Sequence, residues 1–187
     1  MLDDASTQRL EVKRFDVAVQ IRNVEIELFW KRSVFFWGFI ASAFIGYAGL
    51  RKDSPDLALV TACFGMVCSC AWTLLNRGSK YWQESWEGKV ERFESDVTGK
   101  FFAEEEPIQY HKGCWLRARK FSVSKLAIAL SDYVFLLWFS LVVAGVLRKY
   151  APTFAGSFES YGPGLFAAFS VIYLVLLVGF GRKSSRP

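Results

Sequence analysis

The sequence has few of the residues from which catalytic and metal sites are usually built. It contains one histidine, His111, four cysteines, and no glycine-rich phosphate-binding loop. Cys63, Cys68 and Cys70 fall within one apolar stretch, while Cys114 forms an isolated H-x-x-C pair with His111. A zinc site needs about four such ligands, and a Ser-His-Asp site needs its own histidine beside the nucleophile. We therefore expect no catalytic residue, no cofactor, and no metal site unless neighbouring subunits complete one. The protein is not expected to be an enzyme.

Charged residues are almost absent from four long blocks, although the chain as a whole is 52% hydrophobic and contains 18 phenylalanines. The blocks are Val34 to Leu50, Leu57 to Leu75, Leu126 to Leu147 and Gly162 to Gly181. Crossing a hydrocarbon core of about 30 Å takes roughly twenty helical residues, which is the length of each block. A soluble bundle would need a polar shell that a chain of this size lacks. The predicted fold class is all-α: a polytopic membrane protein with four transmembrane helices plus cytoplasmic amphipathic helices.

The predicted organisation alternates polar segments with membrane hairpins. About thirty mostly polar residues precede the first block and no small-residue cleavage site follows it, so the first span is expected to stay in the mature protein. The expected segments are a cytoplasmic N-terminal helix (1–33), a transmembrane hairpin (34–75, with spans 34–50 and 57–75), a cytoplasmic helix and connector (76–125), a second hairpin (126–181, with spans 126–147 and 162–181) and a cytoplasmic tail (182–187). The loop 148–161 is expected to be an ordered turn or a short re-entrant piece.

Basic residues are distributed unevenly between the two sides of the membrane. The segments 1–33, 76–125 and 182–187 hold 19 of the lysines and arginines, whereas the two short loops hold 4. The positive-inside rule then places both termini in the cytoplasm. The same segments contain 14 acidic residues, a mixture poorly suited to nucleic acid. Membrane lipids are the expected partners of the basic residues beside the spans, with a role in orientation alone as the equal alternative. These candidate headgroup contacts are Lys31, Arg32, Arg117, Arg119, Lys120 and Lys125.

Two amphipathic segments flank the first hairpin. The first admits a helix, with one face formed by Leu10, Arg14, Val17, Ile21, Val24 and Leu28, or a strand in which Phe15, Val17, Val19 and Ile21 alternate. Helix is favoured because the segment lacks glycine and proline. In the second segment, an apolar helical stripe is formed by Trp82, Trp86, Val90, Phe93 and Val97.

The two stripes are expected to pack against each other, within a subunit or between subunits. The predicted packing residues are Val17, Ile21, Val24, Leu28, Trp82, Trp86, Val90, Phe93 and Val97. In the alternative, the helix of the second segment lies flat on the membrane. This is disfavoured because its polar face is acidic and would be repelled by anionic lipid.

Asp132 is the one acidic or basic side chain among Asp, Glu, Lys, Arg and His inside a predicted span. Ionisable groups at membrane depth are candidates for a functional role, which here would be transport or gating. Because Asp132 lies near the cytoplasmic edge, snorkelling or pairing with a basic neighbour such as Lys125 would also satisfy it.

Three segments resemble a known family. They are EIELFWKRSVFFWGFI, FGMVCSCAWTLLNRGSKYWQESWEGKVERFE and FSVSKLAIALSDYVFLLWF, and together they are similar to the RipA-like family of octameric bacterial inner-membrane proteins. The block from Asn76 to Glu87 is the most specific part. The resemblance implies a ring-like homo-octamer in the bacterial inner membrane with cytoplasmic termini. It implies no reaction.

Two functions from different classes remain open after this resemblance. The leading hypothesis is a non-enzymatic ring-like scaffold with a cytoplasmic helical collar. The alternative is an oligomeric channel or transporter that uses Asp132. An intramembrane enzyme is the least favoured, because no nucleophile–base pair is visible.

Overall fold

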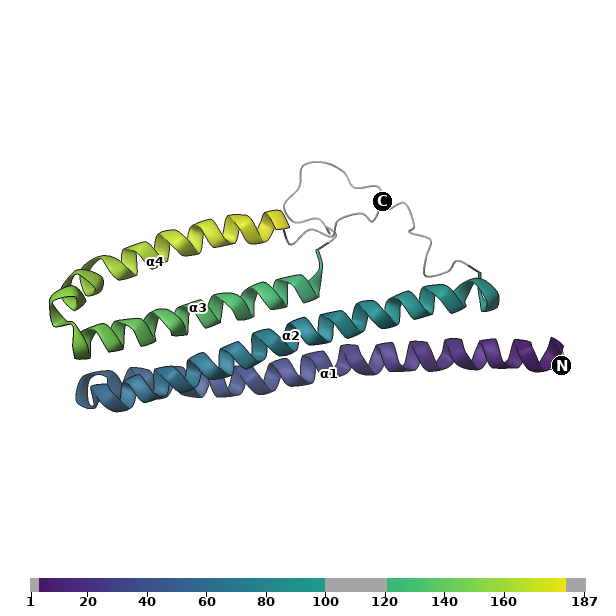
Figure 1. Cartoon of the computed structure of the whole chain (residues 1–187), viewed down its shortest axis with the longest axis horizontal. Helices are drawn as coiled ribbons and strands as arrows, with labels where there is room; N and C mark the ends of the chain where they lie inside the picture. Colours follow the sequence, from purple (N-terminus) through teal and green to yellow (C-terminus); the bar gives the residue numbers. More distant parts are fainter. Residues whose placement is uncertain (1–3, 100–120, 181–187) are drawn as a thin grey trace. The chain divides into compact units, whose positions relative to one another are not determined.

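The computed structural model describes residues 4–99 and 121–180, and this part of the chain is built from helices (Figure 1). In chain order they are α1 (Asp4–Asp53), α2 (Pro55–Val97), α3 (Val123–Tyr150) and α4 (Pro152–Phe180), with no strand in the described ranges. All four are long and apolar enough to cross a membrane. The predicted fold class is confirmed, and the segment before the first span is helix rather than strand. Most of the predicted connector and the whole tail 182–187 lie outside the described residues.

The first two helices continue well beyond their apolar blocks. α1 has 50 residues and α2 has 43, whereas about twenty suffice to cross the hydrocarbon core. Ser54 separates them, and its backbone N–H still bonds the carbonyl of Leu50. Pro55 starts α2, a position where the missing N–H has no helical partner to lose. The second span and the tryptophan-containing helix are therefore one continuous helix.

The segment 148–161, expected as a turn or re-entrant piece, is instead almost entirely helical. α3 runs to Tyr150, Ala151 caps it by donating its N–H to Leu147, and α4 begins at Pro152. Proline suits a first helical turn, so Pro152 starts a helix here rather than a loop. A helix also satisfies its own backbone groups beside the membrane, which a glycine-rich loop would not do.

The chain divides into two compact units. The helix-pair unit contains residues up to Arg32 together with a second segment that begins at Arg77, and its described parts are 4–32 and 77–99. The membrane unit contains 33–76 and a segment that begins at Ala118, and its described parts are 33–76 and 121–180. Both α1 and α2 contribute to each unit. The units divide after residue 32, just before the first apolar block begins at Val34, and after residue 76, just beyond the end of the second block at Leu75.

Candidate functional site

A narrow apolar seam holds the helix-pair unit together. Phe15 and Ala18 of α1 are buried against Val90 of α2. Partly buried residues pack around these three: Val19, Trp86, Phe93 and Val97. Burial of such side chains stabilises the pair by roughly 25 cal/mol for each Å² of apolar surface removed from water. The pairing is also fixed by a hydrogen bond of 3.3 Å from Arg32 Nη1 to Ser79 Oγ.

The stripe predicted on α2 is divided between the seam and the surface. Val90 is buried, and Trp86, Phe93 and Val97 pack against the seam. Trp82 remains 51% exposed. The exposed indole is therefore free to contact something outside the unit.

On α1 the structure buries a different face from the one expected from sequence. Val17 and Val24 are 43% and 51% exposed, while Ile21 and Leu28 are only half-buried. The buried line is formed by Phe15, Ala18 and Phe29. Their spacing is helical, but the small side chain of Ala18 gives a weak apolar signal. The larger valines define a second apolar face on α1.

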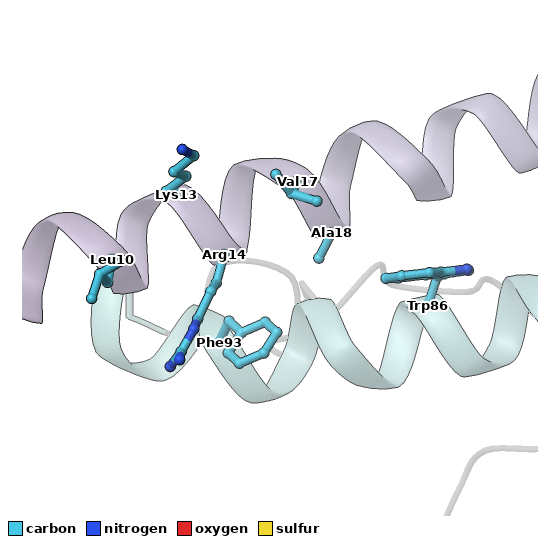
Figure 2. Close-up of a pocket in the computed structure, with 7 residues that line it drawn as sticks. All are labelled: Leu10, Lys13, Arg14, Val17, Ala18, Trp86 and Phe93. Carbon is cyan, nitrogen blue, oxygen red and sulfur yellow. The ribbon is translucent and has the colours of Figure 1, made fainter.

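Beside the seam lies an open groove of about 430 Å³ (Figure 2). It is lined by Leu10, Lys13, Arg14, Val17, Ala18, Trp86 and Phe93. Lys89 places its ammonium nitrogen 3.7 Å from the centre of the Trp86 ring, a cation–π contact. The groove is thus apolar at its floor and basic at its rim.

Several charged side chains of the helix-pair unit are paired along their own helices. Arg14 contacts Glu11 at 2.8 Å, and Lys80 contacts Glu84 at 2.9 Å. A hydrogen bond from Lys31, helped by its positive charge, lowers the pKa of Glu27. Lys31 is exposed, as a lipid headgroup contact would require. The charges keep the outer faces of the helices solvated.

The membrane unit is organised around Trp138 of α3, which is 0% exposed. Its ring stacks on Phe44 with centroids 4.2 Å apart and meets Tyr47 edge to face at 6.1 Å. A Cβ added to Gly65 of α2 would lie 2.4 Å from the indole, so this position has room only for glycine. Ala43 and Ala62 complete the buried core. One side chain therefore joins α1, α2 and α3.

Buried polar groups link the same three helices. Trp72 Nε1 donates to Ser33 Oγ at 3.3 Å, which joins α2 to α1. Asn76 Nδ2 donates to Ser131 Oγ at 3.2 Å and to the carbonyl of Ala127 at 3.4 Å, which joins α2 to α3. Such bonds stabilise helix association in a medium without water.

α4 packs on α3 through tyrosine hydroxyls. Tyr133 and Ser170 share a hydrogen bond of 2.8 Å, and Tyr173 donates to the carbonyl of Ala129 at 2.7 Å. The aromatic rings of Tyr133, Phe166, Phe169 and Tyr173 surround these bonds. The rest of α4 presents large aliphatic side chains to its surroundings, among them Leu165, Val171 and Val175.

The remaining candidate residues are only partly covered by the structure. Asp132 is half-buried and directly follows Ser131, while Lys125 is exposed near the start of α3. Cys63, Cys68 and Cys70 are half-buried free thiols. Within residues 4–99 and 121–180, no group of three potential metal ligands comes together. The other candidates lie outside the described residues: His111, Cys114, Arg117, Arg119 and Lys120.

Comparison with known proteins identifies the family. The family model for the octameric membrane protein family (8xMP) matches residues 12–147. No curated protein and no solved structure gives a significant match. The matched range covers most of α1, all of α2 and most of α3, and therefore includes the seam, the core around Trp138 and every residue of the groove except Leu10. The chain belongs to the octameric membrane protein family.

Proposed function

We propose that this protein is a non-enzymatic integral membrane scaffold, in which identical copies form a ring and their helix-pair units form a cytoplasmic collar. The observation that carries this proposal is the apolar surface left uncovered on the helix-pair unit. Trp82, Val17 and Val24 are each at least 40% exposed although they lie outside the apolar blocks. An octameric assembly offers neighbours that would cover this surface.

The energetic argument uses the exposed indole. A tryptophan buries about 150–250 Å², so covering the exposed half of Trp82 removes on the order of 100 Å² from water. At about 25 cal/mol per Å² this contributes roughly 2 kcal/mol to each contact between subunits. In a closed ring this contribution is repeated at every interface.

The proposed location is the bacterial inner membrane, with both termini in the cytoplasm. The distribution of lysine and arginine supports this orientation, because the helix-pair unit and the tail carry most of them. Lys31 and Lys125 are exposed near the predicted membrane edge, which suits contact with anionic headgroups. Membrane lipids and further copies of this chain are the proposed partners.

Replacement of Trp82 by serine tests the scaffold. Because Trp82 is exposed, Trp82→Ser should leave the four helices inserted and yet lower the particle mass in a mild detergent. The mass is measured by native mass spectrometry or light scattering. Phe154→Ser, which alters an exposed aromatic residue at the start of α4, is the matched control and should keep the mass of the unmodified protein. A Trp82→Ser particle that still contains eight copies contradicts the collar.

A channel or transporter is the second candidate, favoured by Asp132. This carboxyl group is half-buried in α3, next to the buried Ser131 that binds Asn76. Ionisable groups at membrane depth often line ion pathways. The proposal predicts that proteoliposomes conduct ions and that Asp132→Asn abolishes the conductance. Electrically silent proteoliposomes of the intact oligomer would exclude this second function.

A further inference from the structure

The helix-pair unit has two unlike flanks, one on each side of the seam. On one side lies the groove, and the residues of α2 that border this side are spaced by four, three and four: Trp82, Trp86, Lys89 and Phe93. On α1, Leu10, Val17 and Val24 follow at steps of seven, so they share one helical face. We name the side that contains the groove and these residues the groove face.

The other flank is acidic. Glu84, Glu87 and Glu91 recur at steps of three and four, and a helix turns about 100° per residue. This rotation places them across the buried line of Gln83 and Val90 from the groove. On α1, Val12 and Asp16 lie on the corresponding side, and both are exposed. We name this set of five residues the acidic face.

We propose that the groove face of one copy binds the acidic face of a second copy, so that the helix-pair units associate head to tail. This inference rests on the proposed oligomeric scaffold and names the surfaces that join its subunits. A contact between two different faces of identical chains repeats until a ring closes. A contact between two identical faces gives a dimer instead.

Charge favours the head-to-tail arrangement. The rim of the groove carries Lys13, Arg14 and Lys89, whereas the opposite flank carries Asp16 and the three glutamates, one of which, Glu84, is paired with Lys80. Two groove faces placed together would bring like charges into contact, which penalises that alternative. Pairing with the acidic face brings opposite charges together and fixes the register of the two copies.

Apolar contact supplies the remaining part of the interaction. Val17, Trp86 and Phe93 line the groove, and Val12 is the exposed apolar residue of the acidic face. Trp82 lies on the same side of α2 as Trp86, so a bound neighbour would cover it as well. The proposed contact would therefore cover Val12, Val17 and Trp82, which the seam leaves exposed.

Charge reversal in the full-length protein tests the proposal. Lys13→Glu with Lys89→Glu reverses the groove face, and Glu84→Lys with Glu87→Lys reverses the acidic face. Each double variant should assemble at least about tenfold more weakly at low ionic strength, since two attractive pairs become repulsive. Co-expression of the two variants should restore the mass of the unmodified ring, because their reversed faces are complementary in an alternating ring. Reversed variants that each assemble normally overturn the proposal.

Cysteine cross-linking gives an independent measurement that changes no charge. In a background where the four native cysteines are alanine, Val12→Cys and Val17→Cys are introduced singly and together. Five residues apart on one helix, these thiols lie on different flanks, so a linker shorter than the helix diameter of about 10 Å cannot join them within one chain. A short thiol cross-linker applied to membranes should then produce a ladder of oligomers from the double variant alone.

The possible outcomes distinguish a failure of the proposed interface from a failure of the proposed scaffold. Covalent dimers from Val17→Cys alone would show that two groove faces meet, and would overturn the head-to-tail contact. An octameric protein without a ladder would overturn the interface while the scaffold stands. A monomeric unmodified protein in mild detergent would overturn the scaffold and the interface together.

Discussion

The helix-pair unit and the membrane unit, although they share α1 and α2, expose different kinds of side chain. In the helix-pair unit the seam is formed by Phe15, Ala18 and Val90, and the charged side chains lie mostly outside. In the membrane unit, serines and an asparagine are buried between helices, while Ile45 is 76% exposed. The contrast follows from the surrounding medium. Lipid accepts exposed aliphatic side chains but no unpaired polar group. Water instead favours exposed polar and charged side chains and the burial of apolar ones.

The strongest way to break this contrast is to remove the centre of the membrane unit. Trp138→Ala deletes a fully buried indole that packs α3 against α1 and α2, and should cost about 3–5 kcal/mol through lost contacts and a cavity. Thermal unfolding in detergent measures the loss. Phe139→Ala, at the next position but half-exposed, is the control and should change the midpoint far less. Equal shifts for the two variants would contradict a core centred on Trp138.

The corresponding test in the helix-pair unit is a substitution that adds volume to the seam. Ala18→Leu inserts a larger side chain between Phe15 and Val90 and should destabilise the helix pair by about 1–3 kcal/mol. Hydrogen exchange followed by mass spectrometry should show faster exchange in 4–32 and unchanged exchange in α3. Ala48→Leu, at an exposed position of α1, is the control. Slow exchange retained throughout 4–32 would mean that the seam tolerates the added volume.

A polar deletion in the membrane unit should have a smaller effect. Asn76→Ala removes the donor to Ser131 and Ala127 and should cost about 1–2 kcal/mol. Asn76→Asp keeps the size but replaces the donating amide, and is expected to be at least as harmful. If Asn76→Ala unfolds at the temperature of the unmodified protein, these bonds do not stabilise the packing of α2 against α3.

The smallest effect is expected where α2 begins and α3 ends. Lys149 contacts Asp56 at 2.7 Å, and this hydrogen bond with the negative charge raises the pKa of Lys149. Both side chains are well exposed, so Lys149→Ala should hardly change the midpoint of thermal unfolding. The double variant with Asp56→Ala should be no less stable than the single one. A clear further loss in the double variant would show that Asp56 has another role.

The sequence predicted the helices better than it predicted their contacts. Runs of apolar residues and the absence of glycine and proline before Val34 were sufficient to predict the four spans and the continuous α1. The α1 side of the seam was missed because Ala18 contributes little to an apolar pattern, even though its small size permits close approach. The role of Trp138 could not be predicted either, since it depends on Gly65, more than seventy positions away. Segment 148–161 was wrongly predicted to be a turn or re-entrant piece, because proline and glycine also occur within helices near membranes.

The fit of Trp138 against Gly65 has a consequence for the order of assembly. The recess is formed by α1 and α2, whereas the indole that fills it belongs to α3. A ribosome synthesises the first hairpin before the third helix, and segments made earlier generally fold earlier. The recess at Gly65 is thus exposed to lipid for a short time during synthesis. It is filled when the third helix inserts and Trp138 packs into it.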